Sequence, residues 1–291
     1  MHRIIKAHLD SFVKNFGLDA EDEAHQFEKF CIHAVLASRY AASFDLDDVT
    51  TGDGDDGIDG IAVVIDEDVC ISPEDAKTTF SSARRNHDVD VVFVQAKRSE
   101  SFDLGDFLKF KEAILRFAVQ TPYKPDDDCL QNTRHIFDSV VSNVPKIRNG
   151  KPSLVARYVA TGLYKNPPAL ETAKSDFMVQ LEELGLFADY DIKFIDRDQL
   201  TKLWVGTYSG INASLDLFSN APLPAIAGID EAYLVVVRAS DLVTNLLTSP
   251  DGNLRTQVFE ENVRSSRLST NQPALVRLQE RAQNCSVTDR G

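Results

Sequence analysis

The first two hundred residues alternate between nearly continuous apolar runs and stretches with amphipathic spacing. Residues 61–65 and 89–97 are apolar at almost every position, which is typical of strands covered on both faces. Along residues 104–117 the phenylalanines and leucines recur every three or four positions, which predicts an amphipathic helix. This alternation predicts an α/β protein with a mixed central sheet flanked by helices.

The same pattern gives the expected extent of each element. Helices are predicted at residues 20–38, after residue 103, partly within 72–88 and at 168–184, and strands at residues 61–65, 69–71, 89–97, 154–161 and 190–195. Asp19 and Asp103 are the expected N-caps of the first two long helices, because an aspartate side chain accepts hydrogen bonds from the first free backbone amides of a helix. The return from residues 61–65 to 69–71 predicts a hairpin.

The pattern changes after Trp204. A linker, a strand and a short helix are predicted there, at residues 220–224, 232–237 and 241–247. The tail from Ser265 is rich in Ser, Asn, Gln and Arg and is expected to be poorly ordered. We therefore expect a first domain over residues 1–205 and a smaller C-terminal α+β region over residues 206–291.

Composition supports an ordinary globular protein and adds a charge pattern. The chain has 291 residues, is 43% hydrophobic and carries a net charge of −14, which argues against a protein that coats nucleic acid. From residue 131 to 165, however, six basic residues face one acid. Within it, Lys146, Arg148 and Lys151 form either part of a phosphate-binding groove or a solvated loop.

Cysteine spacing and hydropathy exclude several classes of protein. The four cysteines, Cys31, Cys70, Cys129 and Cys285, are scattered, which indicates neither a zinc site nor a disulfide framework. No run of 18 apolar residues is present, and the N-terminus lacks the apolar core of a signal peptide. We expect a cytoplasmic protein that does not associate with membranes.

Three polar side chains stand at neighbouring ends of the apolar strands. Asp59 stands at the start of the first strand, and Gln95 and Lys97 stand at the end of the strand at 89–97. Because side chains two positions apart share a face of a strand, Gln95 and Lys97 project side by side. A carboxylate, an amide and an ammonium group are costly to bury unless they bind something. A divalent cation together with a phosphate would satisfy all three.

Residues 54–61, Gly-Asp-Asp-Gly-Ile-Asp-Gly-Ile, and residues 94–98, Val-Gln-Ala-Lys-Arg, resemble the PD-(D/E)xK nucleases in the branch where Gln replaces the second acid. The run is similar to Mrr-type restriction endonucleases and closer to the N-terminal nuclease region of the abortive-infection phage-resistance (AIPR) proteins. The resemblance covers Glu28 to about Lys165. Residues 258–264 faintly resemble the start of the AIPR domain, but the expected Asn-Asn-Gly-Ile-Thr continuation is absent, so we expect a short or truncated member.

The resemblance implies a restriction-endonuclease-like core and a Mg²⁺-dependent nuclease, with Mn²⁺ as a substitute. Asp59 is the expected principal metal ligand, Gln95 contributes its amide oxygen, and the backbone carbonyl of Ala96 is a further ligand. Glu28 interrupts an apolar helix face, where it either reaches the metal site or extends into solvent. Lys97 is expected to orient the attacking water and stabilise the charged transition state.

The remaining expectations concern partners. Arg98 follows the motif and, with the basic residues at 146, 148 and 151, is a candidate for nucleic-acid binding. Asp56 is either an outer-shell partner of the metal or a turn residue beside Gly57. DNA is favoured over RNA, a homodimer is expected, and the implied setting is bacterial anti-phage defence.

Two other interpretations compete with the nuclease. Residues 55–66 partly match a calcium loop of EF-hand type, but Gly57 occupies a ligand position and the last position is Asp66 rather than glutamate. A phosphate-binding P-loop is excluded because no Gly-Lys-Ser/Thr occurs. A nuclease-like module without catalysis, which binds nucleic acid or a partner protein as a defence scaffold, is the alternative of a different class.

Overall fold

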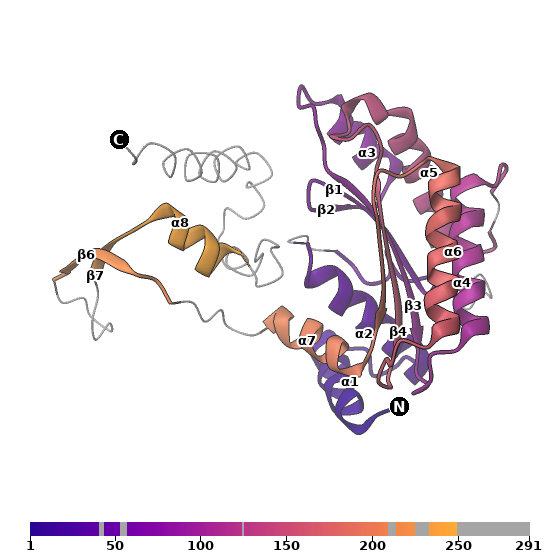
Figure 1. Cartoon of the computed structure of the whole chain (residues 1–291), viewed down its shortest axis with the longest axis horizontal. Helices are drawn as coiled ribbons and strands as arrows, with labels where there is room; N and C mark the ends of the chain where they lie inside the picture. Colours follow the sequence, from indigo (N-terminus) through magenta and orange to yellow (C-terminus); the bar gives the residue numbers. More distant parts are fainter. Residues whose placement is uncertain (41–43, 53–56, 124, 209–213, 225–232, 249–291) are drawn as a thin grey trace. The chain divides into compact units, whose positions relative to one another are not determined.

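The computed structural model describes residues 1–40, 44–52, 57–123, 125–208, 214–224 and 233–248 (Figure 1). The chain divides into two compact units, Met1–Thr207 and Tyr208–Gly291. Within the described ranges, no helix is both long enough and apolar enough to cross a membrane.

The first unit is built on a mixed five-stranded sheet with the order β2-β1-β3-β4-β5. Its strands are β1 (Gly60–Ile65), β2 (Asp68–Cys70), β3 (Val89–Lys97), β4 (Ser153–Ala160) and β5 (Tyr190–Ile195). β1 pairs antiparallel with both β2 and β3, whereas β3, β4 and β5 run parallel. The predicted α/β architecture with a mixed central sheet is confirmed.

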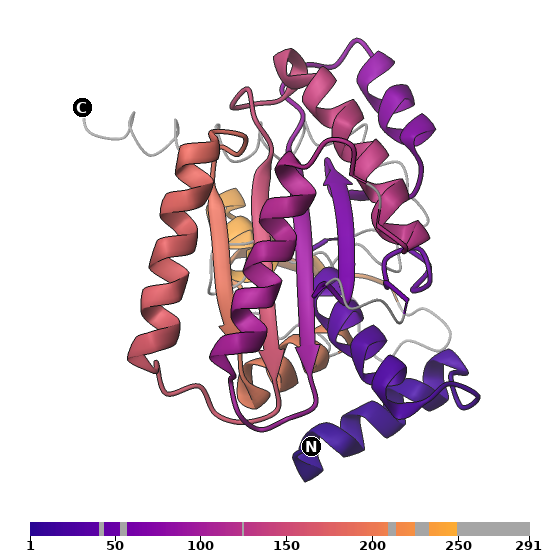
Figure 2. The same ribbon diagram turned by 90° about the vertical axis from the view of Figure 1, so that its right-hand side faces the viewer.

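Helices cover both faces of this sheet (Figures 1 and 2). One layer contains α3 (Pro73–Ser81), α4 (Leu104–Val119), α5 (Asp128–Ser142) and α6 (Pro168–Leu184), and the other contains α1 (Arg3–Phe16), α2 (Glu23–Ala37) and α7 (Arg197–Tyr208). The alternation along β3 explains both layers. Val91 and Phe93 belong to the core under α4, while Val92 and Val94 belong to the core under α2. Gln95 and Lys97 therefore start from the α4 side of the sheet.

Local capping agrees with the sequence at α4 and corrects it at α2. Asp103 caps α4 as predicted, with its Oδ1 accepting from the amide of Asp106 at 2.9 Å. The predicted cap Asp19 of the first long helix is wrong, because Asp22 fills that place. Its Oδ1 accepts from the amides of Ala24 and His25 at 2.7 and 3.1 Å, so α2 begins at Glu23.

Three helices of the first unit were not predicted, namely α1, α5 and α7. In α1 the buried residues Ile5, Leu9, Phe12 and Val13 have helical spacing, but the many polar neighbours hide it. In α5 the buried stripe lies within the stretch that we interpreted only by its positive charge. In both cases a narrow apolar stripe on a largely polar helix gave too weak a periodic signal.

The described part of the second unit contains a two-stranded antiparallel ribbon of β6 (Leu217–Pro222) and β7 (Tyr233–Val237). The short α8 (Ala239–Asp241) and a π-helical turn (η2, Leu242–Leu247) follow it. The predicted linker at residues 220–224 is wrong for its first three positions, which belong to β6. The AIPR-like segment at 258–264 and the tail from Ser265 lie outside the described residues.

Candidate functional site

The three polar residues of the motif meet at one edge of the sheet. Because β1 runs antiparallel to β3, with Gly60 opposite Val94, the start of β1 lies beside the end of β3. The backbone amide of Asp59 donates to the carbonyl of Val94 at 3.0 Å and extends this pairing by one residue. Asp59 is thereby placed directly beside Gln95, on the adjacent strand.

Gly57 allows the loop before Asp59 to pass close to α4. Its φ of +76° is in the left-handed region, and a Cβ there would lie 3.2 Å from the carbonyl oxygen of Lys109. A side chain at residue 57 would therefore displace the loop that delivers Asp59. Glycine at this position serves both the turn and the close approach.

Among the described residues, hydrogen bonds reach the carboxylate of Asp59 through one oxygen only. Its Oδ2 accepts hydrogen bonds of 2.6 Å from Gln95 Nε2 and from the backbone amide of Ala96. No described residue donates a hydrogen bond to Oδ1. Oδ2 therefore fixes the orientation of the group.

The charge state of Asp59 depends on opposing effects. Burial raises its pKa, while the hydrogen bond from Ala96, the positive charge of Lys97 and the hydrogen bond from Gln95 lower it. Negative charge on Asp106 raises the pKa further, and the net result lies above the ordinary value. Burial therefore disfavours an ionised Asp59, and a bound cation would offset that cost.

Glu28 approaches the same site from α2. Its side chain is 26% exposed, and its Oε2 lies 3.2 Å from His25 Nδ1. Burial, and then the nearby charge of Asp59, raise the pKa of Glu28 to about 7. Helix α2 also passes close to Asp59, because a Cβ at the adjacent Gly60 would lie 2.4 Å from Ile32 Cγ1. Glu28 stands one helical turn before Ile32 on the same face of α2.

The raised pKa of Glu28 predicts an unusual pH dependence of stability. Between the ordinary pKa near 4.5 and the folded value of about 7, the folded chain holds a proton that the unfolded chain releases. The free energy of unfolding should therefore fall as pH rises through this window. Glu28→Gln, which removes the titration, should stabilise the metal-free protein by about 1–3 kcal/mol at pH 8 and by far less at pH 4.5.

Urea unfolding in EDTA at the two pH values measures this difference. Glu112→Gln, at an exposed position on α4, is the matched control and should have the same small effect at both pH values. A stabilisation by Glu28→Gln that does not depend on pH would contradict the placement of Glu28 beside Asp59.

Lys97 and Arg98 end β3 and open the following loop. Lys97 is partly exposed, and its charge acts on Asp59. Among the described residues no carboxylate lies within ion-pair distance of Lys97. Arg98 is exposed, with Nη1 3.8 Å from Oε1 of Glu23, and is accessible to a solute at this edge.

The donor set fits a hard divalent cation that completes its shell with water or phosphate. It offers carboxylate oxygens from Asp59 and Glu28, an amide from Gln95 and the carbonyl of Ala96. Within the described part of the chain, no three acidic, His or Cys side chains are grouped closely enough to hold an ion. Mg²⁺ commonly needs only one or two carboxylates when substrate phosphate contributes. Because Gln95 presents its nitrogen to Asp59, its amide must rotate half a turn to present oxygen to an ion.

Two neighbours of the site were missed by sequence reasoning. Asp106, in the first turn of α4, raises the pKa of Asp59. Tyr158 on β4 lies opposite Gln95 in the sheet; burial and then the charges of Asp106, Asp103 and Asp59 raise its pKa. The position of Asp106 could have been predicted from the sequence, because a helix that follows a parallel strand begins at the carboxyl edge of the sheet.

The structure does not bring Lys146, Arg148 and Lys151, three of the predicted nucleic-acid-binding residues, to this site. Lys146 donates to the carbonyl of Phe80, and Arg148 forms hydrogen bonds of 2.5 and 2.8 Å with Asp88. Both lie beside the start of β3, at the opposite end of a nine-residue strand from Lys97, which corresponds to roughly 25–30 Å.

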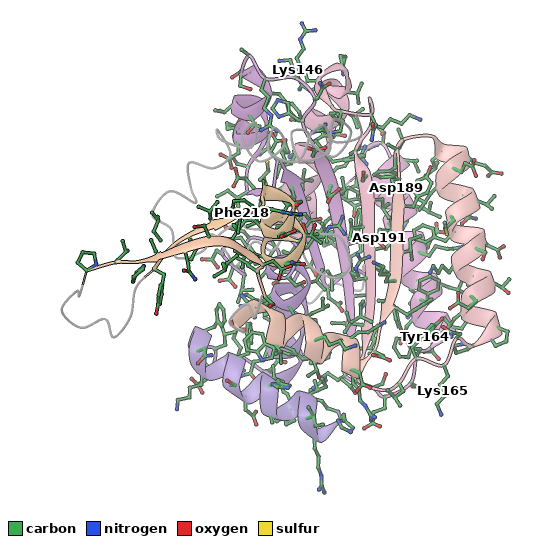
Figure 3. All side chains as sticks on the ribbon, turned by 60° about the vertical axis from the view of Figure 1, so that its left-hand side comes forward. Lys146, Tyr164, Lys165, Asp189, Asp191 and Phe218 are labelled. Carbon is green, nitrogen blue, oxygen red and sulfur yellow. The ribbon has the colours of Figure 1, made fainter. Side chains whose placement is uncertain are left out.

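Figure 3 labels Lys146 at one end of the sheet and Lys165, on the loop after β4, at the other. Lys151 is exposed before β4, near the same end as Lys146, and Asp56 lies outside the described residues. A role of Lys146, Arg148 and Lys151 in binding nucleic acid stays a prediction, and it concerns phosphates distant from Asp59.

A scan against protein-family models, a search of curated proteins and a search of solved structures each found no match to this chain.

Proposed function

We propose that this protein is a Mg²⁺-dependent nuclease that hydrolyses phosphodiester bonds in DNA. The observation that carries the proposal is the convergence of Asp59 with Gln95 and Ala96 at 2.6 Å, with the positive charge of Lys97 acting on the same carboxylate. Burial makes Asp59 harder to ionise, and this polar cluster at the end of an apolar sheet has no evident structural purpose.

Each side chain has a distinct task in this proposal. Asp59, Gln95 and Glu28 would hold Mg²⁺, with Ala96 as a backbone ligand. The ion would supply neutralisation of phosphate charge and a more acidic water. Lys97, without a described ion-pair partner, would orient the attacking water and stabilise negative charge on the phosphate. Arg98 would contact the nucleic-acid backbone next to the cleaved bond.

The finer assignments belong to the same proposal. The core would be restriction-endonuclease-like, since a helix carrying Glu28, a hairpin and a strand ending Gln95-Ala96-Lys97 occur in the order that the resemblance implies. The biological setting would be bacterial defence against phage, as in the AIPR proteins that the sequence resembles. A homodimer would let two sites act on two strands.

Plasmid nicking in the presence of Mg²⁺ tests the proposal through Lys97. Lys97→Ala should lower the cleavage rate about 10²–10³-fold, because a positioned positive charge on the transition state is lost. Lys174→Ala is the matched control, since Lys174 has similar partial exposure but lies on α6. The control should cleave like the wild type, and EDTA should stop both.

A parallel arm with single-stranded RNA of matched length distinguishes the substrate. Preferential cleavage of RNA would correct the choice of DNA while keeping the reaction. Binding of DNA without cleavage by the folded wild type in Mg²⁺ or Mn²⁺ would contradict the nuclease and favour the scaffold module.

A further inference from the structure

The candidate site is assembled from elements that are distant in sequence. Glu28 comes from α2, whereas Gln95 and Lys97 come from β3. These elements contact through an apolar layer that includes Phe30, Val35 and Val92. Apolar packing fixes the separation of a helix and a sheet but allows small sliding movements along the interface.

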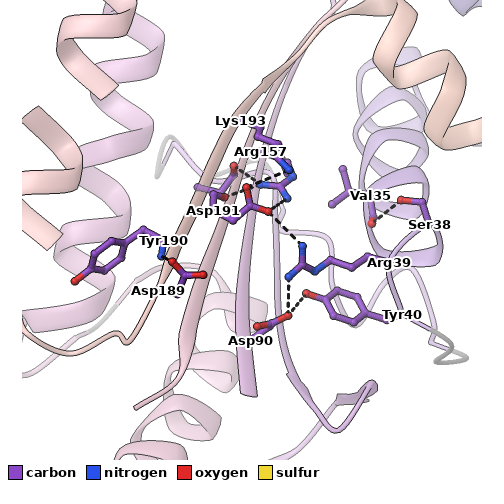
Figure 4. Close-up of polar contacts among 11 residues, drawn as sticks. Val35, Ser38, Arg39, Tyr40, Asp90, Arg157, Asp189, Tyr190, Asp191 and Lys193 are labelled. Carbon is purple, nitrogen blue, oxygen red and sulfur yellow. Dashed lines mark hydrogen bonds and ion pairs between the residues drawn. The ribbon is translucent and has the colours of Figure 1, made fainter. Parts of the chain in front are cut away.

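Directional contacts at the far end of α2 restrict that sliding. Arg39, two residues beyond the helix, donates from Nη2 to Asp90 Oδ2 and from Nη1 to Asp191 Oδ2, both at 3.2 Å. Tyr40 adds a hydrogen bond of 2.7 Å from its hydroxyl to the same oxygen of Asp90 (Figure 4). Asp90 is the second residue of β3, so Arg39 and Tyr40 bind directly to the strand that carries Lys97.

The acceptors of Arg39 are themselves fixed. Arg157 on β4 donates to the backbone carbonyl of Asp191 at 2.6 Å and to its Oδ2 at 2.5 Å. Lys193 lies 3.3 Å from Asp191 Oδ1. Burial disfavours an ionised Asp191, but the charge and the hydrogen bond of Arg157 outweigh burial and lower its pKa. The contacts therefore join α2 to β3, β4 and β5 through ionised, geometrically defined groups.

The arrangement has a geometric consequence at the site. Glu28 precedes Arg39 by eleven positions, which is about 16 Å along a helix. Because a helix is stiff over this length, a restraint at its end also limits movement at Glu28.

We propose that Arg39 is a positioning residue that holds α2 on β3, so that Glu28 stands beside Asp59 before a divalent cation arrives. This inference rests on the proposed function of the site. Without Arg39, part of the free energy of metal binding must be used to fix α2 in its position on β3. Metal affinity should then fall, although no ligand has been altered.

Titration of the full-length protein with Mn²⁺, followed by the loss of the free-ion electron paramagnetic resonance signal, tests the inference without measuring activity. Arg39→Met should weaken Mn²⁺ binding about tenfold, and Arg39→Lys, which keeps the charge but not the two-pronged geometry, should lose less. Tyr40→Phe removes only the hydroxyl and should weaken binding about two- to threefold. It keeps the test decisive if Arg39→Met does not fold.

Arg84→Met is the matched control. Arg84 is 31% exposed and pairs with the buried Asp66 at the far end of the sheet, and Arg39 is 33% exposed. Loss of Arg84 should lower the melting temperature but leave Mn²⁺ affinity within twofold of the wild type. Every titration is performed well below the melting temperature of the variant.

Each outcome decides the inference. Mn²⁺ affinity of Arg39→Met and Tyr40→Phe equal to that of the wild type would overturn the positioning role while leaving the metal site intact. Equal weakening in Arg84→Met would show a general effect of stability and would also overturn it. Absence of Mn²⁺ binding by the folded wild type would overturn the proposed metal site, and the inference with it.

Discussion

Asp59→Asn is expected to reduce Mg²⁺-dependent cleavage by roughly 10³-fold, because the anionic ligand that anchors the metal is lost and metal assistance is worth several kcal/mol. The substitution keeps the shape of the side chain. The new amide oxygen can still accept from Gln95 Nε2 and Ala96 N, so the local fold should persist. Since burial raises the pKa of Asp59, removing its charge should leave the melting temperature unchanged or higher.

Single-turnover cleavage of a plasmid, with thermal unfolding measured on the same samples, separates the two effects. Asp68→Asn is the control, because it removes one carboxylate whose pKa is also raised, from β2 of the same sheet. It should cleave at the wild-type rate. Cleavage by Asp59→Asn within threefold of the wild type would remove Asp59 from the metal site.

Gly162→Ala is expected to destabilise the first unit by at least ~3 kcal/mol, with a fall in melting temperature of about 6–12 °C. A Cβ at this position would lie 1.7 Å from the backbone carbonyl oxygen of Glu100. That oxygen belongs to the loop after β3, and the carbonyl of Gly162 also accepts from the amide of Arg197 at 3.1 Å. The backbone is held from both sides, so it cannot move away cheaply.

The same loop connects this effect to the site. The neighbouring Thr161 donates from its amide to Ser99 and from its hydroxyl to Arg98 and Ser99, directly after Lys97. Gly162→Ala should separate the loop after β4 from the loop after β3. It should therefore also lower the cleavage rate at temperatures where the variant is folded.

Differential scanning calorimetry compares Gly162→Ala with Gly206→Ala. Gly206 is in α7, where an added Cβ meets no atom within 4 Å, so that control should be neutral or stabilising by up to ~1 kcal/mol. A melting temperature of Gly162→Ala equal to that of the wild type would contradict the close approach of the two loops.

The elements closest to the site were predictable because their signals are local. Strand β3 extends over the predicted residues 89–97, since apolar runs of this length are distinctive in sequence. The juxtaposition of Gln95 and Lys97 follows from the two-residue period of a strand. Glu28 could be singled out because it interrupts an apolar helix face, and it lies one helical turn before Ile32, which packs against Gly60.

Long-range arrangement was not predictable from the same signals. The basic stretch at 131–165 looked like one patch, but Arg157 is buried against Asp191 and Arg134 lies over the ring of Phe117. Basic residues that are close in the sequence therefore do not form one positively charged surface. The contacts of Arg39 join residues 51 and 152 positions apart. No periodicity reports such pairs, because they depend on the order of strands in the sheet.

Diffraction from crystals grown with Mn²⁺, measured at the manganese absorption edge, tests the metal site most directly. The account predicts one strong anomalous peak at about 2.1–2.3 Å from Asp59 Oδ1, with Glu28 and Gln95 bound directly or through water. A well-ordered Asp59 that keeps its contacts to Gln95 and Ala96, with no anomalous peak beside it at saturating Mn²⁺, would contradict the account.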